Sequence, residues 1–143
     1  MKLQKNTLFA LYSVLESASR PARQLSAGAI ARKYSISPHH LAKVPHTLAR
    51  AGVVESVRGV GGGYRFAGNA KRLTLMDVIQ LFENIGAPPR VAGSRPRRQA
   101  ARTGIERALR SVLAEIDEIA KATLRSISIA TLLKLMERQR RRA

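Results

Sequence analysis

The chain of 143 residues contains no cysteine and no tryptophan, and only 4% of its residues are aromatic. Without cysteine, disulfides, thiol switches and CxxC redox chemistry are excluded. The aromatic side chains are too few to recognise single-stranded nucleic acid by base stacking, so Tyr64 and Phe66 are expected in the core. No apolar run approaches the roughly 18 residues of a membrane span and no signal peptide precedes Asn6, which predicts a cytoplasmic protein.

Acidic residues are also scarce, because 26 Lys and Arg face only 9 Asp and Glu, giving a net charge of +17. Such a field favours nucleic acid or an anionic surface as the partner. Residues 1–72 carry twelve of the cations against Glu16 and Glu55 alone, so the larger excess lies in that half. No arrangement of serine, histidine and acid and no inward pair of acids is evident, so an enzyme is not expected.

Residues 26–50 have the pattern of two short helices joined by a turn. Apolar residues repeat at helical spacing over residues 27–34, behind Ser26 as a favourable N-cap. Ser37 and Pro38 then provide an N-cap hydroxyl and a proline at the first helical position, where its missing N–H costs nothing. The short link Ser35-Ile36 between the two segments suits a helix-turn-helix.

The second of these helices has two different faces. Leu41, Val44 and Leu48 form an apolar stripe that predicts burial against a core. The opposite face carries donors and cations suited to base edges and phosphates, namely His39, His40, Lys43, His46, Thr47 and Arg50. This segment is the candidate recognition helix. Because Pro45 lies within it, we expect a kink or a shortened first half.

The three histidines fall within eight residues, which raises the alternative of a metal site. Zinc needs three or four ligands that converge on one point, whereas adjacent helical residues such as His39 and His40 diverge by about 100°. No cysteine or nearby acid completes the set. A metal is therefore not expected, and contact with DNA or a neutral surface remain as the two interpretations of these side chains.

After Gly52, a natural C-cap, two alternating segments predict a β-hairpin. They are residues 53–58 and 64–67, and Gly59-Val60-Gly61-Gly62-Gly63 lies between them. Glycines permit positive φ and a close approach of backbone N–H groups to phosphates, and Arg58 and Arg65 stand at the two shoulders of this tip. The sequence therefore predicts that the hairpin is a wing that contacts a polyanion.

Further helices are predicted on both sides of this unit. Residues 6–18 present a broad apolar face, and residues 74–77 resemble a capping box in front of a fourth helix. Residues 86–102 are rich in proline, glycine and arginine and show little periodicity, which is typical of a mobile loop. A second capping box at residues 103–106 precedes an apolar seam expected to meet its twin in a second copy: Ile105, Leu109, Val112, Leu113, Ile116 and Ile119.

These patterns predict a mainly α-helical protein with a small β-hairpin wing, that is, a winged helix-turn-helix followed by a long C-terminal dimerisation helix. A homodimer would place two recognition helices about 34 Å apart, so that they read the half-sites of an imperfect palindrome. The expected parts are the DNA-binding domain (1–84), a loop (85–103), the dimerisation helix (104–125) and a short last helix (129–136) with a solvated basic tail (138–142) in the remainder, 126–143.

The segments MKLQKNTLFALYSVL, AGAIARKYSISPHHLAKV, LARAGVVESVRGVGGGYRFA and LTLMDVIQLFE resemble the IscR, NsrR and CymR family of bacterial regulators, also called the Rrf-two type. The resemblance is strong over about the first 84 residues, and the string VRGVGGGY is quite specific. It implies a homodimeric transcription regulator, usually a repressor, in which Arg58 reaches a base or the minor groove from the wing.

Many members of that family sense iron, nitric oxide or redox state through an iron–sulfur cluster held by three cysteines. A gap-free comparison places Val91, Arg97 and Thr103 at those positions, and none of them can replace a thiolate on iron. This cluster is therefore not expected, and no other cofactor is indicated. A response to a small ligand, to a partner protein or to the regulator's own concentration stays open.

The predicted contacts with double-stranded DNA fall into two groups. Phosphate contacts that position the protein are expected from Lys5, Lys33, Arg50 and Arg65. Base contacts are expected from His39, His40, Lys43, His46 and Arg58. Ser37, Gly61 and Gly62 complete the predicted interface.

Two other functions would use the same features. A basic winged-helix protein without sequence preference could act on chromosome architecture or on RNA, since the net charge serves both. An adaptor could instead bind an acidic protein through Arg95, Arg97 and Arg98, in which case His39 and Arg58 would not matter.

Overall fold

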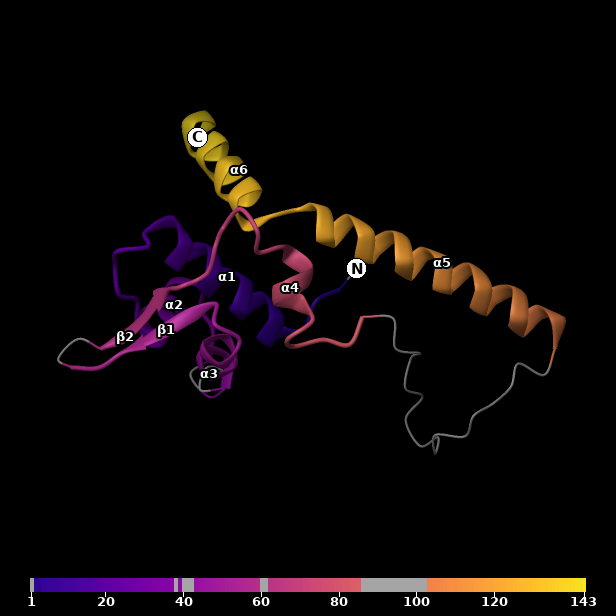
Figure 1. Cartoon of the computed structure of the whole chain (residues 1–143), viewed down its shortest axis with the longest axis horizontal. Coiled ribbons are helices and arrows are strands. Elements are labelled where there is room, and N and C mark those ends of the chain that lie inside the picture. Colours follow the sequence, from indigo (N-terminus) through magenta and orange to yellow (C-terminus); the bar gives the residue numbers. More distant parts are fainter. Residues whose placement is uncertain (1, 38, 40–42, 60–61, 86–102) are drawn as a thin grey trace.

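The structure is a computed structural model of the chain, and it describes residues 2–37, 39, 43–59, 62–85 and 103–143. Within these residues the elements are α1 (Lys5–Ser19), α2 (Ala27–Lys33), α3 (Lys43–Arg50), β1 (Val54–Val57), β2 (Gly63–Phe66), α4 (Leu75–Ile79), α5 (Gly104–Ser126) and α6 (Ile129–Arg142) (Figure 1). The mostly helical architecture with one antiparallel hairpin confirms the predicted fold class. The predicted loop over residues 86–102 lies outside the described residues.

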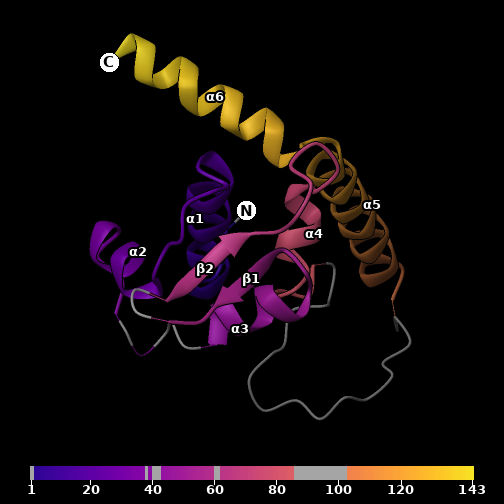
Figure 2. The same ribbon diagram turned by 60° about the vertical axis from the view of Figure 1, so that its left-hand side comes forward.

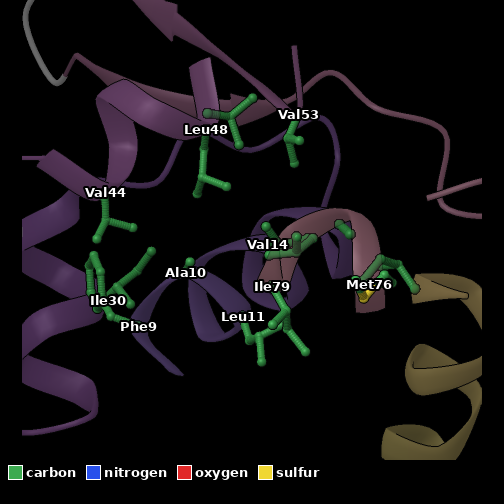
Figure 3. Packing of buried hydrophobic residues seen from close by; sticks show 14 of the residues in the cluster. Phe9, Ala10, Leu11, Val14, Ile30, Val44, Leu48, Val53, Met76 and Ile79 are labelled. Atoms are coloured by element: carbon green, nitrogen blue, oxygen red, sulfur yellow. The ribbon is translucent and has the colours of Figure 1, made fainter. Parts of the chain in front are cut away.

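The core is built around α1, which contacts α2, α3, α4, α6 and β2. Figure 3 shows side chains from α1, α2, α3 and α4 converging there, among them Phe9, Ile30, Val44 and Ile79. Phe9 and Val44 are completely buried, because each lies on the inward stripe of its helix. Tyr64 and Phe66 are partly buried against the same cluster, as the sequence predicts.

Side-chain caps fix where three of the helices begin. The Ser26 hydroxyl accepts the N–H of Ala29 at 3.1 Å, which caps α2. At α4, Thr74 and Asp77 each accept the backbone N–H of the other, so the predicted capping box is complete. The Thr103 hydroxyl accepts the N–H of the third helical residue of α5 at 3.1 Å. These short local signals explain why the predicted starts of α2, α4 and α5 agree with the structure.

The hairpin differs from the sequence-based prediction at one end of its loop. Gly63 pairs with Val57 and is the first residue of β2, whereas the sequence alone predicts it in the loop over residues 59–63. The reason is tertiary, because Tyr64 and Leu25 exchange two backbone hydrogen bonds of 2.8 Å and form an isolated β-bridge beside β2. A Cβ on Gly63 would lie 2.5 Å from the carbonyl oxygen of Leu25. Gly63 therefore belongs to the strand, where only glycine fits.

We expect Gly63→Ala to lower the free energy of unfolding by about 1–3 kcal/mol, because its methyl group meets a backbone carbonyl that cannot yield without breaking strand pairing. Gly28→Ala is the matched control, since it lies in α2 with no atom within 4 Å of the added Cβ. That change should raise the free energy of unfolding by about 0.5–1 kcal/mol through helix propensity. Urea denaturation of both variants checks this, and equal effects would contradict the packing described for Gly63.

The C-terminal part consists of the long helix α5, which projects from the body, and α6, which returns to α1 (Figure 1). Between them the chain pairs with the segment before α4: Ile129 N–H donates to Leu73 at 2.8 Å, and Leu75 N–H donates to Ile127 at 2.9 Å. This pairing fixes the root of α5 on the body. No helix in the described part of the chain is long and apolar enough to cross a membrane.

The predicted short last helix and basic tail require a correction. The structure continues α6 to Arg142, so the stretch from Arg138 to Arg142 is helical and its side chains are exposed. Arginine and glutamine are good helix formers, and cations are favourable near the C-terminal end of a helix dipole. The charged composition of this stretch was therefore compatible with a helix from the start.

Candidate nucleic-acid interface

The helix α3 has the two faces predicted for a recognition helix. Val44, Pro45 and Leu48 are buried on one side, while Lys43, His46 and Arg50 are exposed on the other. Figures 1 and 2 both place α3 at the end of the molecule opposite α6. The cationic face of α3 therefore points away from the core on which the helix rests.

Pro45 is accommodated without a break in α3. Its side chain is buried, and α3 is continuous across it from Lys43 to Arg50. The predicted helix start lies further toward the N-terminus. That start, Pro38, and the stripe residue Leu41 lie outside the described residues, as does His40. Ser37 and His39 are exposed just before α3.

The end of α3 sets the direction of the wing. Gly52 has φ +77°, and Val53 N–H donates to the carbonyl of Leu48 at 3.0 Å, which closes the helix as its glycine predicts. The chain then enters β1 beside α3, so the hairpin and the recognition helix are neighbours. Arg58 follows β1 directly and is exposed at the start of the tip. This arrangement places an exposed cation on the wing that follows the candidate recognition helix.

The glycines of the wing have a role inside the hairpin. A Cβ on Gly62 would lie 2.8 Å from the carbonyl oxygen of Val57, so the turn itself excludes a larger residue. The sequence-based interpretation gave Gly61 and Gly62 to DNA phosphates. Gly61 lies outside the described residues, and for Gly62 the close approach within the hairpin is sufficient reason for glycine.

Two of the side chains predicted to contact DNA phosphates already form ion pairs within the protein. Lys33 forms an ion pair with Glu16 on α1. Arg65 Nε donates to Glu55 Oε1 at 2.8 Å across the hairpin. Sequence reasoning missed both pairs, although Glu16 and Glu55 were visible as the only acids among residues 1–72. Lys5, in contrast, is exposed at the first residue of α1.

Glu16 also holds the first helix of the helix-turn-helix in place. The Tyr34 hydroxyl donates to Glu16, and the Tyr34 ring stacks on Tyr12 with centroids 4.3 Å apart. Burial alone would raise the pKa of Glu16, but the bonds from Lys33 and Tyr34 outweigh it and hold that pKa below its usual value. Burial, followed by the bond to Glu16, raises the pKa of Tyr34 to about 12. The cluster thus fixes α2 on α1.

The predicted dimerisation seam is exposed along α5. Its apolar side chains are between 54% and 75% accessible, namely Ile105, Leu109, Val112, Leu113, Ile116 and Ile119. Leu124 alone among the α5 residues is buried, at the end where the helix joins the body. An unburied stripe of this size is what a helix presents when its partner is another chain.

The donor set does not fit the cluster of the resembled family. The chain contains no thiolate. Of the positions aligned with the cluster cysteines, Thr103 is the N-cap of α5, while Val91 and Arg97 lie outside the described residues. In the part of the chain that the structure describes, no three His, Asp or Glu side chains are placed to hold a metal ion.

Comparison with known proteins gives a family match over nearly the whole chain. The model of the Rrf2 family, described as "Iron-dependent Transcriptional regulator", matches residues 3–135. The protein named "Putative HTH-type transcriptional regulator BadM" of Rhodopseudomonas palustris is 55% identical over 142 residues, which cover 99% of this chain and 87% of that protein. The HTH-type transcriptional regulator NsrR of Bacillus subtilis is 35% identical over 85 residues, 59% of this chain and 58% of that one.

Solved structures share the fold at lower identity. CymR, the global cysteine regulator of B. subtilis, gives a TM-score of 0.73 at 24% identity and covers 94% of this chain and 98% of its own. IscR of T. potens gives a TM-score of 0.74 at 23% identity, with 97% and 90% covered. These likenesses support the arrangement of a winged helix-turn-helix with a long C-terminal helix.

Proposed function

The chain belongs to the Rrf2 family of DNA-binding transcriptional regulators, and on that premise we propose that it is a homodimeric repressor of an imperfect palindromic operator. The observation that carries this proposal is the two-faced α3, buried through Val44 and Leu48 and exposed through Lys43, His46 and Arg50. A helix of this kind beside a basic wing can enter the major groove while the wing follows the backbone. Bound over a promoter, such a dimer excludes polymerase from it.

The proposed contacts divide by chemistry. Lys5 and Arg50 are exposed cations that meet phosphates on any duplex. On the operator the same role is proposed for Lys33 and Arg65, which must first leave their carboxylates. Base edges are assigned to Lys43, the exposed histidines and Arg58. Ser37, His40, Gly61 and Gly62 complete the set of residues proposed to contact DNA.

Dimerisation through α5 fixes the distance between the two DNA-binding domains. The exposed apolar stripe of α5 pairs with its copy, and the pairing of Ile129 with Leu73 ties each α5 to its own DNA-binding unit. Residues 1–84 then form the reading unit, 104–125 the dimerisation helix and 126–143 the closing segment, with 85–103 between the first two. A regulator that binds the chromosome in this way acts in the bacterial cytoplasm.

Two substitutions test the division between positioning and reading. Arg58→Ala is expected to cost about 1–3 kcal/mol on the operator and to relax specificity at the position that the wing contacts. Lys5→Ala should weaken operator and random duplexes alike and reduce the salt slope by about one. Fluorescence anisotropy on both duplexes measures the four affinities. Equal losses on operator and random DNA for both variants would refute the assignment of Arg58.

A second function is favoured by one observation, the net charge of +17, which attracts any polyanion. In that case the protein is an architectural or RNA-associated factor with the same fold. The two proposals differ in sequence preference alone, and the charge contributes equally to both.

A further inference from the structure

The outer face of the wing carries an ion pair that the proposed DNA contacts leave unexplained. Glu55 on β1 lies directly opposite Arg65 on β2. Arg65 directs both Nε, at 2.8 Å, and a terminal nitrogen toward the same oxygen of Glu55. The two side chains are 49% and 44% exposed, so the pair lies at the surface where a phosphate could reach it. While the pair holds, that edge of the guanidinium is occupied.

The choice of residue at position 55 is unusual for this half of the chain. Glu16 and Glu55 are the only acids among residues 1–72, against twelve cations. Glu16 has a structural reason, because its side chain is only 17% exposed and it binds both Lys33 and Tyr34. Glu55 has no comparable role in holding helices together, because within the described residues its one side-chain partner is Arg65. A carboxylate on a DNA-facing wing also repels phosphate.

We propose that Glu55 limits the nonspecific DNA affinity of this protein by withholding Arg65 from phosphates. Phosphate contacts add affinity on every sequence, so each free cation on the wing strengthens binding to random DNA. An exposed ion pair is weak, but a phosphate must displace the carboxylate and then remain beside its negative charge. Glu55 thus lowers by one the number of phosphates that the wing neutralises. This inference rests on the proposed contact between wing and DNA.

The test is the salt dependence of binding to a random duplex by the full-length protein. Glu55→Gln keeps the shape of the side chain and removes its charge. It is expected to steepen the slope of log K against log salt by about 0.9, because one more phosphate is neutralised. Between about 50 and 200 mM salt this corresponds to about 3.5-fold more loss of affinity than for the unchanged protein. Glu115→Gln, the same charge change at an exposed site on α5, is the control and should leave the slope unchanged.

The double variant Glu55→Gln/Arg65→Gln decides the mechanism. If Glu55 acts through Arg65, the salt slope of the double variant equals that of the unchanged protein. Arg65→Gln alone then changes the slope little, because on random DNA Glu55 already holds the guanidinium. A steeper slope that persists in the double variant would overturn the proposal, since Glu55 would then act by direct repulsion of phosphate. An unchanged slope for Glu55→Gln would also overturn it.

The failure of this inference can be told apart from that of the proposed function. Arg58→Ala measured on the operator in the same assay reports whether the wing touches DNA at all. If Arg58→Ala shows its operator-specific loss while Glu55→Gln has no effect, only the role of Glu55 is wrong. If neither has an effect, the wing does not contact DNA, and the proposed contact of Arg58 fails together with the role of Glu55.

Discussion

Val112→Glu is expected to convert the protein to a monomer and to weaken operator binding by about 10²–10⁴-fold, the size of the advantage that two linked binding units hold over one. Val112 is 54% exposed on α5 in the isolated chain, so a charge there does not disturb the fold of one copy. In the proposed dimer the same position would meet the seam of the second α5, where two unpaired carboxylates would be buried together. Each monomer then binds one half-site alone and loses the contribution of the second DNA-binding domain.

The control for this prediction lies two residues further along the same helix. Ala114 is exposed about 200° around α5 from Val112, so Ala114→Glu adds the same charge on the face away from the seam. Sedimentation equilibrium should give 15.7 kDa for Val112→Glu and twice that mass for Ala114→Glu and the unchanged chain. A dimeric Val112→Glu with full operator affinity would show that the seam is not the interface.

Ile129→Ala should lower the free energy of unfolding by about 2–5 kcal/mol, the largest effect on stability expected from the residues discussed. Ile129 is completely buried, and its N–H donates to the carbonyl of Leu73 at 2.8 Å, which joins the root of α5 and α6 to the DNA-binding unit. Truncation leaves a cavity at this junction, because the surrounding backbone is held by strand-like pairing and cannot collapse into it.

Leu135→Ala, on the same helix, provides the comparison. Leu135 is 46% exposed, so its truncation should cost less than about 1 kcal/mol. Both variants are unfolded by urea at one protein concentration, since the stability of a dimer depends on concentration. If Ile129→Ala cost no more than Leu135→Ala, the junction would not be packed as described and α5 would not be fixed to the reading unit.

The features that sequence predicted well are those encoded within a few residues. The caps at Ser26, Thr74 and Thr103 join atoms three residues apart, and Gly52 ends α3 through its own positive φ. The buried stripe and exposed cations of α3 follow from helical periodicity alone. Such patterns are legible because neither the cap nor the stripe depends on where the rest of the chain lies.

The features that the sequence did not predict depend on contacts between segments far apart in the chain. Gly63 is predicted in the loop but lies in β2, where it must pass the carbonyl of Leu25, a residue far from it in sequence. The Glu55–Arg65 pair was not predicted, because alternation within each strand does not say which residues of the two strands lie opposite each other. The pairing of Ile129 with Leu73 likewise has no local signature. Within the candidate site, sequence therefore located the cations but not which of them are already paired.

Preference for one DNA sequence distinguishes a regulator from an architectural or RNA-binding protein, and the salt dependence of binding measures that preference. Affinity for a native duplex that the protein enriches from genomic fragments is measured against a scrambled duplex of equal length, at about 50 and 200 mM salt. The net charge of +17 ensures some binding to both, so only the ratio is informative. A specific regulator should prefer the native duplex by about 10³-fold or more and keep that preference at the higher salt. Equal affinities that fall together as salt rises would contradict the claim and favour architectural or RNA binding.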